Sequence, residues 1–277
     1  MATFIFAQLT IREAQRRRIL WVALLMGIGF LTVFGVGFHY VMLELEMFSD
    51  GGTMNTAAGG LLAIGLYATS LLVTVMTVLV SVTTISGEID THTIETLLTK
   101  PVRRWEVVLG KWLAFMLLLA LYLLLLAGGL MLFVYLRSGI TLQNVPAGLG
   151  LMLLQGLIVL SVTILGGTRL STLANGVLAF MLFGIAFLGS WIEQIGALFQ
   201  NETAVDIGII TSLLLPNEVL WRRAVTLFLP EMADSPVMSA GPFVVISQPS
   251  PAMVWYALFY TAVLLLLALF SFSRRDL

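Results

Sequence analysis

Long apolar runs recur along the chain, and short polar segments separate them. Six runs are almost free of charged residues, at about residues 19–38, 57–84, 107–135, 147–167, 170–192 and 252–272. About 20 helical residues cross a hydrocarbon core of about 30 Å, so each run is long enough to span a membrane. The pattern predicts an all-α polytopic membrane protein, with six transmembrane helices in a single transmembrane domain that covers residues 1–277.

The composition fits this class. Of the 277 residues, 59% are hydrophobic and 10% are charged, whereas soluble domains carry about 25% charged residues. The net charge of −1 and the lack of a basic domain give no indication of nucleic acid as a partner. With no cysteine and two histidines, the chain offers no thiolate site, and we expect no metal site.

The first 18 residues have the pattern of a helix that lies on the membrane surface. Phe4, Ala7 and Ile11 recur at helical spacing and form an apolar face. Four arginines gather towards the end of this segment. A signal peptide is excluded because residues 19–38 are a run of 20 uncharged residues, whereas the apolar region of a signal peptide has about 7–15.

Lys and Arg are divided unequally between the two sides of the predicted topology. One side holds 11 of the 14, and the other holds Arg137, Arg222 and Arg223. The positive-inside rule then places both termini in the cytoplasm, in a multi-pass protein of the inner (cytoplasmic) membrane. Membrane lipid is therefore an expected partner. The basic residues predicted at the cytoplasmic membrane surface are Arg12, Arg16, Arg17, Arg18, Arg103, Arg104 and Lys111.

Two segments are predicted to lie on the opposite side. Residues 40–52 are acidic and are expected to form a loop. Residues 199–250, between spans five and six, contain five acidic residues and several prolines, which are too many for a span. We expect short external helices and loops there, with Asn217 as the N-cap of one helix.

The longest strongly polar segment is residues 86–111, between spans two and three. Ser86 is predicted to cap a short helix there, and Pro101 to end it. Residues spaced by four, three and four share one face of this helix: Glu88, His92, Glu95 and Thr99. The pattern predicts a short amphipathic helix at the cytoplasmic membrane surface.

This segment resembles the loop signature of ABC-2 type permeases, which are the membrane subunits of ATP-driven exporters. The resemblance rests on Glu88, Thr93-Ile94-Glu95, Leu97-Leu98, Lys100-Pro101-Val102, Arg103, Glu106 and Gly110-Lys111. The chain departs from the family pattern at His92, where a glycine usually precedes the threonine. Within the family, the layout is most similar to permeases linked to multicopper-enzyme maturation.

The resemblance implies that the polar segment is a coupling helix that docks on an ATPase subunit. The residues assigned to it are Glu88, Asp90, His92, Thr93, Glu95, Leu97, Leu98, Lys100 and Pro101. It also implies alternating access driven by two copies of an ABC ATPase, together with a second permease copy or paralogue. ATP and Mg would bind to the ATPase, and this chain would hold no cofactor.

Catalytic motifs are missing from the sequence. Gly110-Lys111 lacks the upstream glycine and the following Ser or Thr of a phosphate-binding loop. The sequence also contains neither an HExxH nor a GxSxG motif. We therefore expect that this chain is not an enzyme.

A stripe of hydroxyl residues runs along the second predicted span. The stripe consists of Ser70, Thr74, Thr77, Ser81 and Thr84, at spacings of four, three, four and three. Such residues let helices approach closely and bond to one another. They would equally suit the wall of a substrate path or a subunit interface, so packing and pathway are both kept as interpretations.

Other functions are compatible with six spans. A secondary transporter usually needs an ionisable residue deep in the membrane, whereas Lys111 and Glu193 fall near the ends of their runs. A non-transporting membrane assembly or sensor protein would fit the same helices. The substrate is left open among lipid, peptide, drug and metal-related cargo.

Overall fold

The computed structural model describes residues 2–16, 18–48, 51–90, 103–229 and 249–274. These residues form helices with turns and loops between them, and no strand occurs among them. In this part of the chain, six helical segments are long and apolar enough to cross a membrane, or seven if one bent pair counts as a span. The predicted all-α fold with six membrane helices is confirmed.

The membrane helices follow the predicted runs, and several extend beyond them. They are α2 (Arg18–Phe48), α3 (Gly51–Asp90), α5 (Arg104–Leu123) with its continuations η1 (Leu124–Gly128) and α6 (Gly129–Ser138), α7 (Val145–Gly167), α8 (Thr172–Leu198) and α11 (Ala252–Ser273). Helix α1 (Ala2–Arg16) precedes them, and α9 (Glu202–Leu214) and α10 (Asn217–Phe228) lie between α8 and α11. The short helices predicted between spans five and six are therefore present.

The predicted loop at residues 40–52 is wrong, because α2 continues to Phe48 and α3 begins at Gly51. Glu46 on this extension faces Arg137 at the end of α6, whose Nη1 donates a hydrogen bond to Glu46 Oε1 at 2.7 Å. Arg137 Nε also donates to His39 Nδ1 at 3.2 Å. Polar contacts between neighbouring helices thus accompany the continuation of α2 past its apolar run.

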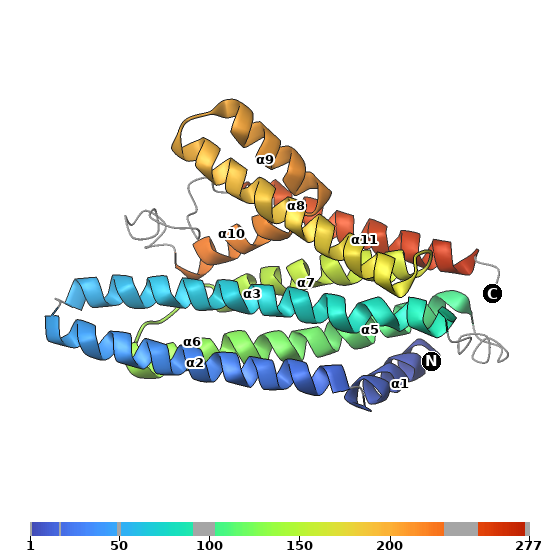
Figure 1. Cartoon of the computed structure of the whole chain (residues 1–277), viewed down its shortest axis with the longest axis horizontal. Coiled ribbons are helices and arrows are strands. Elements are labelled where there is room, and N and C mark those ends of the chain that lie inside the picture. Colours follow the sequence, from blue (N-terminus) through green and yellow to red (C-terminus); the bar gives the residue numbers. More distant parts are fainter. Residues whose placement is uncertain (1, 17, 49–50, 91–102, 230–248, 275–277) are drawn as a thin grey trace.

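Helix α7 lies at the centre of the bundle. It packs against α3, α5, α8, α10 and α11, and 72% of its most apolar stretch is buried, compared with 17% for α2. The main core includes Leu126 from η1 and Ile158 from α7, both completely buried. Figure 1 shows α2, α3, α5 and α6 running side by side on one side of α7, with α8, α9 and α11 on the other.

Helix α1, the end of α3, the start of α5 and the end of α11 all lie at one end of the bundle (Figure 1). Helix α1 packs closely on α5 at Gly110, where a Cβ atom would lie 2.7 Å from both Phe6 Cβ and the Thr3 carbonyl oxygen. Only a glycine lets the two backbones approach this closely. The close contact fixes α1 beside the first turns of α5.

Helices α8 and α9 form a tight antiparallel hairpin. Asn201 caps α9, and its Oδ1 accepts a hydrogen bond from the Ala204 amide at 3.1 Å. Glycines lie along the contact: a Cβ on Gly196 would lie 2.7 Å from Ala204 Cβ, and one on Gly189 would collide with the Thr211 side chain. Small residues of this kind let two helices pack closely where no water competes.

We predict that Gly189→Val loosens the α8–α9 hairpin. Forcing a side chain into a filled contact typically costs about 1–3 kcal/mol, so the thermal unfolding midpoint of the purified protein in detergent should fall. The matched control is Gly184→Val on the same helix, where a Cβ would meet nothing within 4 Å. Equal midpoints for the two variants would contradict the described hairpin contact.

Candidate functional site

The predicted coupling segment begins on the last turn of α3. Glu88 and Asp90 belong to that helix, which ends at Asp90, although their side chains are not among those the structure describes. The remaining predicted residues fall between 91 and 102 and lie outside the described residues: His92, Thr93, Glu95, Leu97, Leu98, Lys100 and Pro101.

Ser86 does not cap a new helix, and that prediction is wrong. It lies inside α3, where its Oγ donates a hydrogen bond to the Val82 carbonyl at 2.6 Å. Its Oγ also shares a hydrogen bond with Thr172 Oγ1 at the start of α8, at 2.9 Å. A serine that bonds to the carbonyl four residues earlier fits within a continuous helix. Span two and the start of the polar segment are therefore one helix.

The predicted basic surface is partly exposed and partly buried. Arg12, Arg16, Arg18 and Arg103 are exposed and Arg104 is half-buried, whereas Arg17 lies outside the described residues. Lys111 differs from these arginines because it is only 3% exposed. Its Nζ reaches across to the Thr84 carbonyl on α3, at 3.4 Å. Lys111 therefore joins α5 to α3 inside the bundle.

All five residues of the hydroxyl stripe on α3 are buried, and two of them bond to α7. Ser70 Oγ donates to Gln155 Oε1 at 2.9 Å, and Ser81 Oγ shares a hydrogen bond with Thr163 Oγ1 at 2.7 Å. Thr77 and Thr84 bond to carbonyls of their own helix, and Thr74 is buried on the same stripe. This geometry favours close helix packing over a water-filled path.

Further polar contacts join α7 and the turn after it to α8, α5 and α11. Asn175 Nδ2 on α8 donates to the Thr163 carbonyl at 2.8 Å, and Trp112 Nε1 on α5 donates to Ser161 Oγ at 3.0 Å. Thr168 Oγ1, just after α7, shares a hydrogen bond with Ser271 Oγ on α11 at 2.8 Å. Helix α7 and the turn after it thus connect the end of α3 to three other helices.

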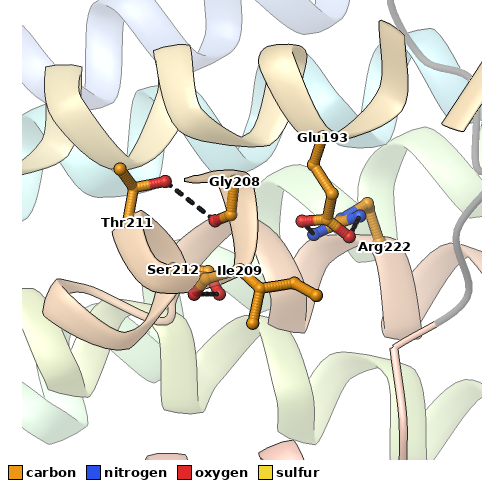
Figure 2. Close-up of polar contacts among 6 residues, drawn as sticks. All are labelled: Glu193, Gly208, Ile209, Thr211, Ser212 and Arg222. Carbon is orange, nitrogen blue, oxygen red and sulfur yellow. Dashed lines mark hydrogen bonds and ion pairs between the residues drawn. The ribbon is translucent and has the colours of Figure 1, made fainter. Parts of the chain in front are cut away.

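Sequence reasoning missed a buried ionic cluster around α10. Arg222 binds Glu193 of α8 through two parallel hydrogen bonds of 2.7 Å (Figure 2), and the two side chains are 4% and 5% exposed. Glu218, one helical turn before Arg222, is also buried. The signal available in the sequence was the i, i+4 spacing of Glu218 and Arg222 within a helix that also carries apolar residues.

The position of α10 explains this error. The sequence predicts surface helices between spans five and six, but α10 packs against α7 inside the bundle. A bend of 103° separates it from α9. The prediction that Asn217 is an N-cap is also wrong, because Pro216 occupies that position and Asn217 is the first residue of the helix. Asn217 itself is fully buried.

Two open grooves lie on the outside of the bundle. One, of about 650 Å³, is lined mostly by apolar side chains of α3 and α8, including Leu79, Val82, Val177 and Phe180. The other, of about 640 Å³, runs along α2 beside Phe133 and includes His39. Among the described residues, no group of three or more His, Asp or Glu side chains is placed to hold a metal ion.

A bundle of six apolar helices, with short helices folded back between the fifth and the sixth, is the architecture of a polytopic membrane protein. The family model for ABC-2 family transporter proteins matches residues 7–277, and the chain belongs to this family. A search of curated proteins finds no match.

Family membership confirms the resemblance seen in the central polar segment. The protein is the membrane component of an ABC transporter, a permease, and membership implies association with an ABC ATPase component. Its membrane helices agree with this assignment.

We predict that the hydroxyl stripe is closed to water in the resting protein. Because the native chain has no cysteine, a single Ser81→Cys variant gives a clean readout, and its thiol should resist a water-soluble thiol reagent. The control is Ser273→Cys at an exposed position at the end of α11, which should react rapidly. Equal labelling rates would instead place the stripe along a water-filled path.

Proposed function

We propose that this chain is one half of an ABC exporter, and that it passes force from an ATPase to the membrane helices through α3. The observation that carries the proposal is the continuity of α3 from the membrane core to Asp90. Helix α5, the next described element along the chain, starts beside α1 (Figure 1). A partner that moves the segment after Asp90 would act directly on a membrane helix.

The polar contacts of α3 supply a route for this force. Displacement of α3 would act on α7 through Ser81 and Thr163, and on α8 through Ser86 and Thr172. Packed helices move as units rather than deforming continuously. ATP binding can bias the two access states only by contacting them differently, and the proposed site of that contact is the segment 88–101.

The assembly we propose contains two copies of the ATPase and two permease halves, either identical or paralogous. The exposed apolar side chains along α2 and α8, among them Val33, Leu173 and Leu188, offer surface for a second permease copy or for lipid. ATP and Mg would be held by the ATPase, and this chain would not hydrolyse ATP. The transported substrate is not assigned.

We further propose that the protein lies in the cytoplasmic membrane with both termini in the cytoplasm. The unequal distribution of Lys and Arg supports this orientation. Helix α1 and the end of α11 lie at one end of the bundle, as an even number of spans requires. Transport would run outward, as in the exporters that the central segment resembles.

Orientation can be tested with reporter fusions. Fusions after Thr99 and Leu277 should report a cytoplasmic location, and fusions after Asp50 and Arg137 should report the opposite side, because the positive-inside rule acts on short loops. A further fusion after Asp234 tests the segment between α10 and α11. A cytoplasmic signal at Asp234 would contradict the six-span topology.

Charge reversal tests the coupling segment. We predict that Glu88→Lys combined with Glu95→Lys leaves membrane insertion and permease pairing intact but sharply lowers co-purification with the ATPase and transport. Opposed like charges in a contact interface can cost several kcal/mol, whereas exposed charges elsewhere contribute about 0–1 kcal/mol. The measurement is the amount of cognate ATPase retained on the tagged permease.

A matched control exists on α9, which lies away from the end of α3 (Figure 1). Glu202 and Asp206 are exposed on α9, so Glu202→Lys combined with Asp206→Lys makes the same change of charge away from the coupling segment. This variant should retain the ATPase. If both double variants retain it equally and transport normally, segment 88–101 is not the docking site.

A further inference from the structure

Helix α10 carries charge into the bundle at a place that the transport proposal does not use. Its first turns hold Asn217, Glu218 and Arg222, which are 0%, 5% and 3% exposed. The helix packs against α7, α8, α11, α3 and α9, so these side chains are covered by protein. A buried charge is costly unless another charge or a set of hydrogen bonds compensates it.

The positive charge of Arg222 is already matched. Its Nη1 and Nη2 donate to Glu193 Oε1 and Oε2, each at 2.7 Å, and Figure 2 shows the guanidinium and the carboxylate facing each other. Two parallel bonds of this kind form the strongest geometry available to an arginine and a carboxylate. The pair is therefore neutral as a unit, and one further carboxyl group remains beside it.

That further group is Glu218. It hydrogen-bonds with Tyr67 of α3, whose ring meets Trp221 edge-on at 5.2 Å between ring centroids. Arg223, the other cation of α10, donates instead to the Pro249 carbonyl at 3.3 Å. Tyr67 is a neutral partner, so it supplies hydrogen bonding to Glu218 but no positive charge.

The remaining helices that pack on α10 supply no second cation. Helices α7 and α11 contain no Asp, Glu, Lys or Arg, and the only such residue of α8 is Glu193. On α9, Glu202 and Asp206 are acidic and exposed. Tyr256 and Tyr260 of α11 donate to the carbonyls of Leu213 and Leu214. The buried cluster therefore has two carboxyl groups and one guanidinium.

We propose that Glu218 is a proton-binding site, and that it is a neutral carboxylic acid while α10 is packed in the bundle. Burial disfavours a negative charge on Glu218 and outweighs the opposing effects of the Tyr67 hydroxyl and of Arg222, whose charge is already balanced by Glu193. The bound ligand is a proton, taken up when α10 packs into the bundle and released to water when α10 separates from it. This proposal goes beyond the permease function and does not depend on the cargo or the ATPase.

The proposal links the packing of α10 to pH. The packed state binds one more proton than the separated state, in which Glu218 would titrate near the ordinary glutamate value of about 4.3. Packing is therefore favoured at low pH. It weakens as pH rises above that value, by up to about tenfold in the equilibrium constant per pH unit, until the packed state itself loses the proton.

Infrared spectroscopy tests the bound proton directly. The carbonyl stretch of a carboxylic acid is resolved from that of a carboxylate. A difference spectrum between the purified protein and Glu218→Gln at neutral pH therefore shows in which form Glu218 is present. We expect the variant to lose a carboxylic acid band. The control Glu202→Gln, at an exposed position on α9, should lose a carboxylate band. Loss of a carboxylate band from Glu218→Gln would overturn the proposal.

A second measurement follows the movement of α10 itself. Val225 is buried on α10, so a Val225→Cys thiol should react with an impermeant reagent only when α10 separates from the bundle. Dividing its labelling rate by the rate of Val225→Cys combined with Glu218→Gln removes the pH dependence of the thiol itself. We expect this ratio to rise with pH, and a constant ratio would contradict the linkage.

Discussion

The hydrocarbon core of a membrane contains no water, so the backbone polar groups inside it have to be satisfied within the protein, and a charged or polar side chain there is costly without a partner. This constraint explains why the described backbone is almost entirely helical. It also explains the side chains at the helix contacts. Ser81 bonds to Thr163, and Arg222 is matched by Glu193, because an isolated polar group would be costly there.

The same constraint organises function. The polar contacts converge on α7, which bonds to α3 through Gln155 and to α8 through the Thr163 carbonyl. Apolar contacts alone let neighbouring helices slide past one another. Hydrogen bonds at several positions along α7 oppose such sliding, so a displacement of one helix is passed on to its neighbours. We therefore propose that the ATPase acts on the end of α3 and that α7 and α8 respond to its displacement.

The number and order of the membrane helices could be predicted from the sequence because each helix is a long apolar run, which is a local signal. The sequence could not show which polar residues are buried inside the bundle or what they contact. Ser86 looked like a cap, but a serine can equally bond within a continuous helix, as it does with the Val82 carbonyl. Arg222 looked exposed because its partner, Glu193, is 29 residues away in the chain. Such pairings depend on tertiary structure, which no local pattern encodes.

The most direct test of the central claim, that the segment after α3 contacts the ATPase, is site-specific photocrosslinking in the intact complex. A photoreactive residue at position 97 should capture the ATPase, whereas one at position 137, in the last turn of α6 beside Glu46, should not. Capture of the ATPase from position 137 but not from position 97, in a complex that still hydrolyses ATP, would contradict the account.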